Sequence, residues 1–133
     1  MSNFSKDQLK SIAQDFHDLS TLIAQFRLDQ IHGGTPLDDP EIVKLLGLQW
    51  NLMNTSASFY VQAAQVALAN ADQAATQITA ATKAANDAIG KLQVINTVFN
   101  IGSAAGVLAA AIMTGDMGQI GTAAKGIYSA IKG

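Results

Sequence analysis

Residues 5–32 read SKDQLKSIAQDFHDLSTLIAQFRLDQIH, and this stretch carries the clearest structural signal in the chain. Its large apolar residues recur at spacings of 3, 4, 3, 4 and 3, namely Leu9, Ile12, Phe16, Leu19, Ile23 and Phe26. This period places them in one helical stripe that packs against other helices. Ser5 and Gln8 have the spacing of a capping box, in which each side chain accepts a hydrogen bond from the backbone of the other. The pattern predicts an amphipathic helix over residues 5–32.

A second helical segment begins at residue 40. The Gly33-Gly34 pair ends the first helix, and Asp39-Pro40 combines an N-cap residue with a proline suited to the first turn. Residues 42–53 are apolar nearly all round, which is typical of a central helix, and we expect Trp50 to anchor a helix contact there. Since neither glycine nor proline occurs between Leu48 and Ile89, we predict one long central helix over 40–90.

The last part of the chain has the pattern of a helical hairpin over residues 94–132. Its first arm is apolar and rich in glycine and alanine, and residues 114–118 (TGDMG) form the predicted turn. The second arm is amphipathic, with large side chains at Ile120, Ile127 and Ile131. We therefore predict a single all-α domain of 133 residues, an elongated bundle of about four helices ending in this apolar hairpin.

Charge is scarce and unevenly distributed. The chain is 49% hydrophobic and only 14% charged, against about 25% charged in an average soluble domain. Of the 18 charged side chains, 11 fall within residues 1–44, and the stretches 45–71 and 92–115 have none. Many amides in the first stretch disfavour a membrane, whereas VFNIGSAAGVLAAAIM (98–113) is a marginal membrane span of about 24 Å. We expect some apolar surface to remain for a membrane or a partner.

The chemistry available for catalysis is limited. A net charge of −2 disfavours nucleic-acid binding, and the absence of cysteine removes thiolate ligands and nucleophiles. His17 and His32 lie in no known catalytic or phosphate-binding motif. Asp15, His17 and Asp18 could offer a metal site, but a solvated helix face explains them more simply. We expect no enzyme activity, no cofactor and no metal.

The hairpin supplies the candidate contact residues. Gly102 and Gly106 form a GxxxG pattern, which allows helices to approach closely in lipid. We predict membrane or partner contacts at twelve positions: Val98, Phe99, Ile101, Gly102, Gly106, Val107, Leu108, Ile112, Met113, Ile120, Ile127 and Ile131. Replacing Gly106 with leucine is expected to abolish assembly or membrane activity while the helical content is retained.

Two family resemblances bear on function. VFNIGSAAGVLAAAIMTGDMGQIGTAAKGI (98–127) resembles the hydrophobic hairpin of bacterial α-helical pore-forming toxins, which implies insertion into a bilayer. The second resemblance is one of composition, between residues 54–87 (NTSASFYVQAAQVALANADQAATQITAATKAAND) and the helical proteins of bacterial R-bodies. This resemblance implies self-assembly.

Three functional hypotheses remain open at this point. The first, which we favour, is a membrane-active, pore-forming or toxin-like component that exposes its hairpin. The second is a self-assembling structural subunit or helical interaction partner, and the third is an inert soluble bundle. The first two predict a lipid membrane or helical protein as partner and a homo- or hetero-oligomer. Residues 1–10 show no secretory signal, so we expect synthesis in the cytoplasm, with a leaderless route of release or export left open.

Overall fold

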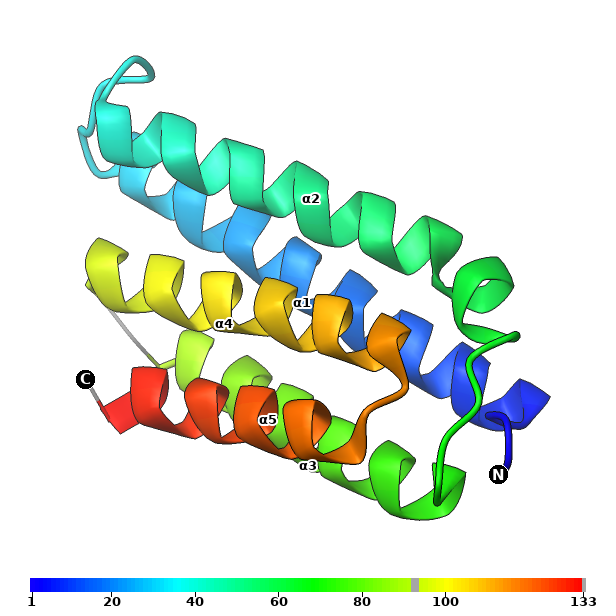
Figure 1. The fold of residues 1–133 in the computed structure, drawn as a ribbon. Helices are drawn as coiled ribbons and strands as arrows, with labels where there is room; N and C mark the ends of the chain where they lie inside the picture. Colours follow the sequence, from blue (N-terminus) through cyan, green and yellow to red (C-terminus); the bar gives the residue numbers. More distant parts are fainter. Residues whose placement is uncertain (92–93, 133) are drawn as a thin grey trace.

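In the computed structural model, residues 1–91 and 94–132 are described, and they form five helices. These are α1 (Lys6–His32), α2 (Pro40–Ala63), α3 (Ala71–Ile89), α4 (Ile95–Thr114) and α5 (Met117–Lys132). Consecutive helices run in opposite directions, as Figure 1 shows. The prediction of an all-α helical bundle is confirmed.

The first helix matches its prediction closely. All six large residues of the predicted stripe are buried. Both bonds of the capping box form: the Gln8 backbone N–H donates to Ser5 Oγ over 3.1 Å, and the Ser5 N–H donates to Gln8 Oε1 over 2.9 Å. Helix α1 packs against α2, α3 and α4, so its buried stripe lies at the centre of the core.

The single long helix predicted over 40–90 is wrong, because α2 ends at Ala63 and α3 begins at Ala71. The break depends on residues far away in the sequence. Ser2 and Leu68 exchange two backbone hydrogen bonds of 2.7 Å each, and the Leu68 side chain is fully buried. Asn70 then caps α3 by accepting from the Gln73 N–H over 3.0 Å. The division of this segment gives five helices where about four were expected.

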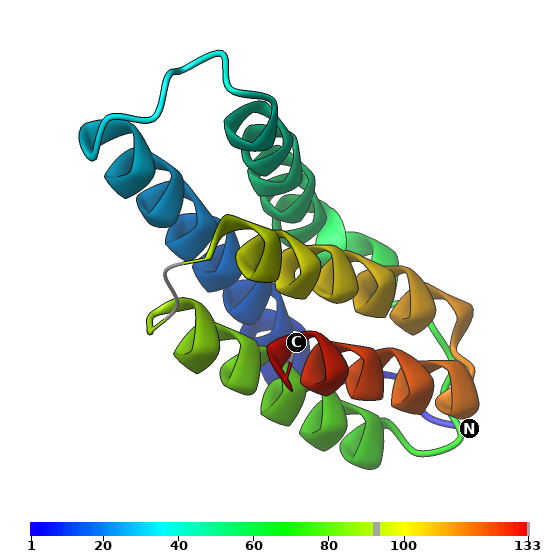
Figure 2. The same cartoon turned by 90° about the vertical axis from the view of Figure 1, so that its left-hand side faces the viewer.

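Helix α2 does not occupy the central position that its apolar sequence predicted. It packs against α1 and α4 and lies at one edge of the bundle, opposite α3 and α5 (Figures 1 and 2). Trp50 is consequently 54% exposed. The central position belongs to α1, whose stripe is contacted from several sides; α2 is buried along one face only.

Helices α4 and α5 lie side by side and are joined by Gly115 and Asp116. Gly115 ends α4 in the left-handed conformation, at φ 71°. A Cβ atom at this position would lie 2.6 Å from the Ala67 carbonyl oxygen, in the loop between α2 and α3. Both the backbone angle and the close approach therefore require glycine here.

Candidate functional site

The predicted contact residues lie mostly in the core of the bundle. Seven of the twelve are buried, namely Val98, Ile101, Gly102, Leu108, Ile112, Ile120 and Ile127. Four are partly exposed, namely Phe99, Gly106, Met113 and Ile131. Val107 alone among them is well exposed, at 61%. Contact between a membrane and the buried seven would require α4 and α5 to leave the bundle.

The two glycines of the GxxxG pattern have different surroundings. A Cβ atom on Gly102 would lie 2.9 Å from Ile23 Cδ1 and closer still to Leu48 Cδ2. Gly102 therefore allows α4 to approach α1 and α2 within the bundle. Around Gly106, no atom lies within 4 Å of the corresponding position. The close-approach position inside this structure is thus Gly102, whereas Gly106 faces open space.

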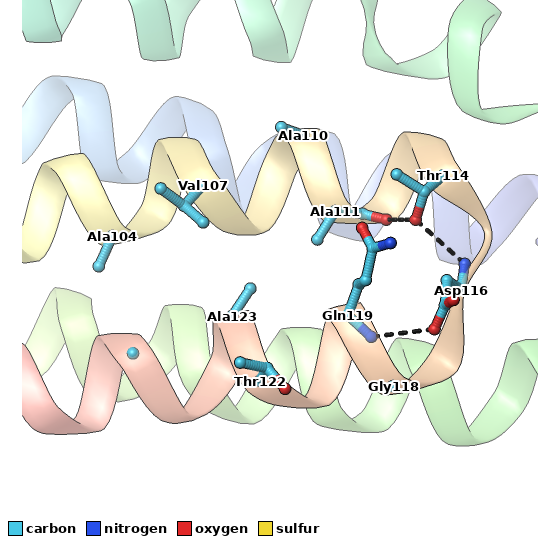
Figure 3. Close-up of a pocket in the computed structure, with 11 residues that line it drawn as sticks. Ala104, Val107, Ala110, Ala111, Thr114, Asp116, Gly118, Gln119, Thr122 and Ala123 are labelled. Atoms are coloured by element: carbon cyan, nitrogen blue, oxygen red, sulfur yellow. Dashed lines mark hydrogen bonds between the residues drawn. The ribbon is translucent and has the colours of Figure 1, made fainter.

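An apolar groove runs along the outer side of α4 and α5. Its volume is about 750 Å³, within the range of small-molecule pockets. Figure 3 shows Ala104 and Val107 from α4 and Ala123 and Thr122 from α5 along its walls. The walls are built from small side chains, so the groove is wide and could accept large apolar groups from outside.

One end of the groove lies at the turn between α4 and α5. The Thr114 hydroxyl donates to the Ala111 carbonyl oxygen over 2.6 Å and accepts from the Asp116 N–H over 3.1 Å. The Gln119 N–H donates to Asp116 Oδ1 over 3.1 Å, so Asp116 caps the start of α5 (Figure 3). These bonds commit Asp116, the one charged residue lining the groove, to a structural role.

The other polar candidates also have structural roles or lie apart. Asp39 caps α2 by accepting from the Glu41 N–H over 2.9 Å. His17 and Asp18 are neighbours on α1, with Nδ1 and Oδ1 3.9 Å apart. Within residues 1–91 and 94–132, no group of three histidine or acidic side chains is placed to hold a metal ion.

Asp15 has the one clearly perturbed acidity among the described residues. Its pKa is raised from 3.8 to about 6, and the largest cause is burial of the carboxyl group. The neighbouring Thr82 hydroxyl lowers the pKa, and the charge of Asp18 raises it. Asp15 Oδ2 is buried and has no hydrogen-bond partner among the described residues. A carboxyl in this position, between α1 and α3, favours the protonated form.

The sequence predictions missed most of the groove. Of its lining residues, the predicted set contained only Val107. Most of the others are small residues, among them Ala104, Ala110 and Thr114 on α4, and Thr122 and Gly126 on α5. The small residues on the face of each helix opposite its large side chains could have indicated the groove. Our predictions selected the large side chains instead.

Helix α4 is the one helix in the described part of the chain that is long and apolar enough to cross a membrane. It has 20 residues and a mean hydropathy of 1.6, and 44% of its most apolar 18 residues are buried. Length and composition alone define this property, and core helices of soluble bundles share it.

Neither a protein-family model, nor a curated protein, nor a solved structure matches this chain.

Proposed function

We propose that this protein acts by physical association, and that α4 and α5 form a membrane-active element of a pore-forming or toxin-like component. The observation that carries the proposal is the composition of α4, which has no charged residue over 20 positions and is less than half buried in its most apolar stretch. The resemblance of residues 98–127 to pore-forming hairpins supports it.

The backbone of the pair is compatible with insertion. Each helix satisfies its own hydrogen bonds, so entry into lipid leaves few unpaired backbone groups. The outer groove presents apolar surface before any rearrangement, and Asp116 lies in the turn, where a charge can stay at the interface. The buried positions Ile101, Leu108 and Ile112 would reach lipid only after α4 separates from α1 and α2.

Liposome flotation and dye release across a pH series test this proposal. We expect the protein to float with the liposomes and to release the dye. Val107→Asp puts a charge near the middle of α4 at an exposed position, and it should weaken lipid binding at least about tenfold. The matched control is Leu37→Asp, because Leu37 is 70% exposed and lies between α1 and α2, outside the hairpin.

Retention of the wild-type protein in the aqueous layer at every pH would overturn membrane activity. Equal loss of binding in both variants would show that α4 is not the inserting element.

A second candidate function is self-association without a membrane. It is favoured by exposed large apolar side chains outside the hairpin, including Trp50 and Val61 on α2. Membrane insertion of α4 and α5 gives these side chains no role. Particles whose mass rises with protein concentration in the absence of lipid would support this function.

A further inference from the structure

We propose that the outer face of α2 binds the same face of a second copy of this chain, with the two α2 helices antiparallel. The proposal rests on the second candidate function, self-association, and assigns it a surface and a register.

The surface is a row of six exposed residues on α2, which we call the outer seam: Val43, Gly47, Trp50, Asn54, Ala57 and Val61. Their spacings are 4, 3, 4, 3 and 4, the pattern of a helix that packs along a second helix. The residues that α2 buries in the bundle, such as Leu45, Leu52 and Phe59, lie on the opposite side of the helix.

The outer seam is unusually apolar for a solvent-facing row. Val43, Trp50 and Val61 are 53%, 54% and 72% exposed. From Leu45 to the end of α2 there is no charged residue, although the free face of a surface helix is ordinarily charged or polar. The free face therefore combines exposed apolar side chains with uncharged amides such as Asn54, a surface that a second helix can cover without burying a charge.

The order of side chains in the outer seam reads nearly the same from both ends. Consider two copies whose α2 helices pair antiparallel about a two-fold axis that crosses the outer seam midway between Trp50 and Asn54. Val43 then faces Val61 of the second copy, and Gly47 faces Ala57 of the second copy. A two-fold interface needs this self-complementarity, because each contact occurs twice with the roles exchanged. The Gly–Ala layers allow close approach of the two helices, since both residues are small.

The central layers place Trp50 opposite Asn54 of the second copy. The indole N–H is a donor only, and the asparagine side chain offers an amide oxygen as acceptor. A tryptophan that is half exposed in the monomer would thus bury its ring and satisfy its polar atom in the pair.

Charge does not oppose this pairing. The two charged residues of α2 are Glu41 and Lys44, near its N-terminal end. In the antiparallel register they face the uncharged C-terminal end of the second helix, so no like charges meet. The seam is about 27 Å long, and one helix pair of that length is smaller than the standard interface of about 800 Å² per partner. We therefore expect a weak dimer that forms at micromolar or higher concentration.

Analytical ultracentrifugation of the full chain over a series of concentrations, with no lipid present, tests the proposal. The mass should rise from 13.9 kDa towards twice that value. Trp50 is the only tryptophan, so its emission should shift to shorter wavelength over the same concentration range. A constant monomer mass with constant emission would overturn both the dimer and self-association as such.

Gly47→Glu tests the surface itself. No atom lies within 4 Å of a Cβ at Gly47, so the monomer can accept the side chain. The variant should weaken dimerisation at least about tenfold, because the dimer would bury a carboxylate without a partner. The matched control is Gly121→Glu on α5, which is equally unobstructed and lies off the seam. If only the α5 variant weakens the dimer, self-association stands and the α2 surface is overturned.

The double variant Gly47→Glu/Ala57→Lys tests the register. In the antiparallel pair each new glutamate faces a new lysine, so dimerisation should recover. In a parallel pair, glutamate would face glutamate and lysine would face lysine, and recovery would not occur. Failure to recover therefore overturns the antiparallel arrangement.

Discussion

Helices α2 and α4 differ in the faces that they turn away from the core. Both have long uncharged stretches, and both bury one side in the bundle. The outer face of α2 carries the large exposed side chains of Val43, Trp50 and Val61, separated by smaller residues. The outer face of α4 carries small ones, such as Ala104 and Ala110, beside a groove.

The difference shows that scarcity of charge has more than one structural consequence. A projecting row such as the outer seam fits a partner with matching gaps, whereas a groove with small side chains accepts groups that project into it. Low charge in the sequence indicates that surface is available for contact, but the shape of that surface decides the kind of contact. Separate variants on the two helices can therefore distinguish their roles.

The largest difference in stability is expected between substitutions on the two opposite faces of α2. Leu52 is 1% exposed, and Leu52→Ala should lower the free energy of unfolding by about 2–5 kcal/mol, because it leaves a cavity in the core. Trp50→Ala should change the stability of the monomer by no more than about 0.5 kcal/mol, because Trp50 is on the surface. Urea unfolding at a dilute concentration, where the chain is monomeric, measures both. Comparable losses would contradict the division of α2 into a core face and a free face.

A smaller effect is expected from the two glycines of α4. Gly102→Leu should destabilise the bundle by about 1–3 kcal/mol, because the new side chain meets Leu48 and Ile23. Gly106→Leu has open space and should stabilise the helix by up to about 1 kcal/mol. Thermal unfolding followed by circular dichroism measures the stability of both variants. If Gly106 is also needed for assembly or membrane activity, Gly106→Leu should remove that activity while the helical signal remains.

The break between α2 and α3 gives the next prediction. Asn70→Ala removes the cap of α3 and should lower stability by about 1 kcal/mol. Gln73→Ala is a suitable control, because the cap uses the backbone N–H of Gln73 and the side chain is exposed. A loss as large in the control as in Asn70→Ala would contradict the capping role. Chemical denaturation of the two variants provides the measurement.

Local signals explain why part of the fold was predictable. The stripe of α1, its capping box and the Asp39-Pro40 start of α2 each depend on residues within a few positions of one another. The end of α2 depends on Ser2 meeting Leu68, 66 positions later, and no neighbouring glycine or proline marks it. Long-range pairing overrode the helical preference of an alanine-rich stretch.

The candidate surfaces were less predictable for a related reason. The spacing of residues along a helix shows which side chains share a face, but it does not show which face the other helices cover. In α2 the sequence alone makes both faces apolar, and only the packing of α1 and α4 shows that Trp50 is outside. In α4 and α5 mainly the large residues were predicted as contact residues, and seven of the twelve predicted positions are buried.

The smallest effect is expected for the pH dependence of the stability of the folded bundle. Asp15 has a folded-state pKa raised from 3.8 to about 6, chiefly by burial, so folding favours its protonated form. Between about pH 4 and pH 6 the folded state holds this proton more tightly than the unfolded state, and stability falls as the pH rises. Because the carboxyl is partly exposed, we expect a total loss of no more than about 1 kcal/mol.

Asp15→Asn should remove this contribution, so its melting temperature should depend less on pH between 4 and 6 than that of the wild type. With this raised pKa, acid stabilises the folded bundle through Asp15, so protonation of Asp15 is not expected to release α4 and α5 at low pH. If dye release nevertheless increases on acidification and does so equally in Asp15→Asn, the trigger must lie at another titrating group. If the melting temperature of the wild type instead rises with pH over this interval and that of Asp15→Asn does not, the raised pKa is wrong and Asp15 is stabilised as a carboxylate.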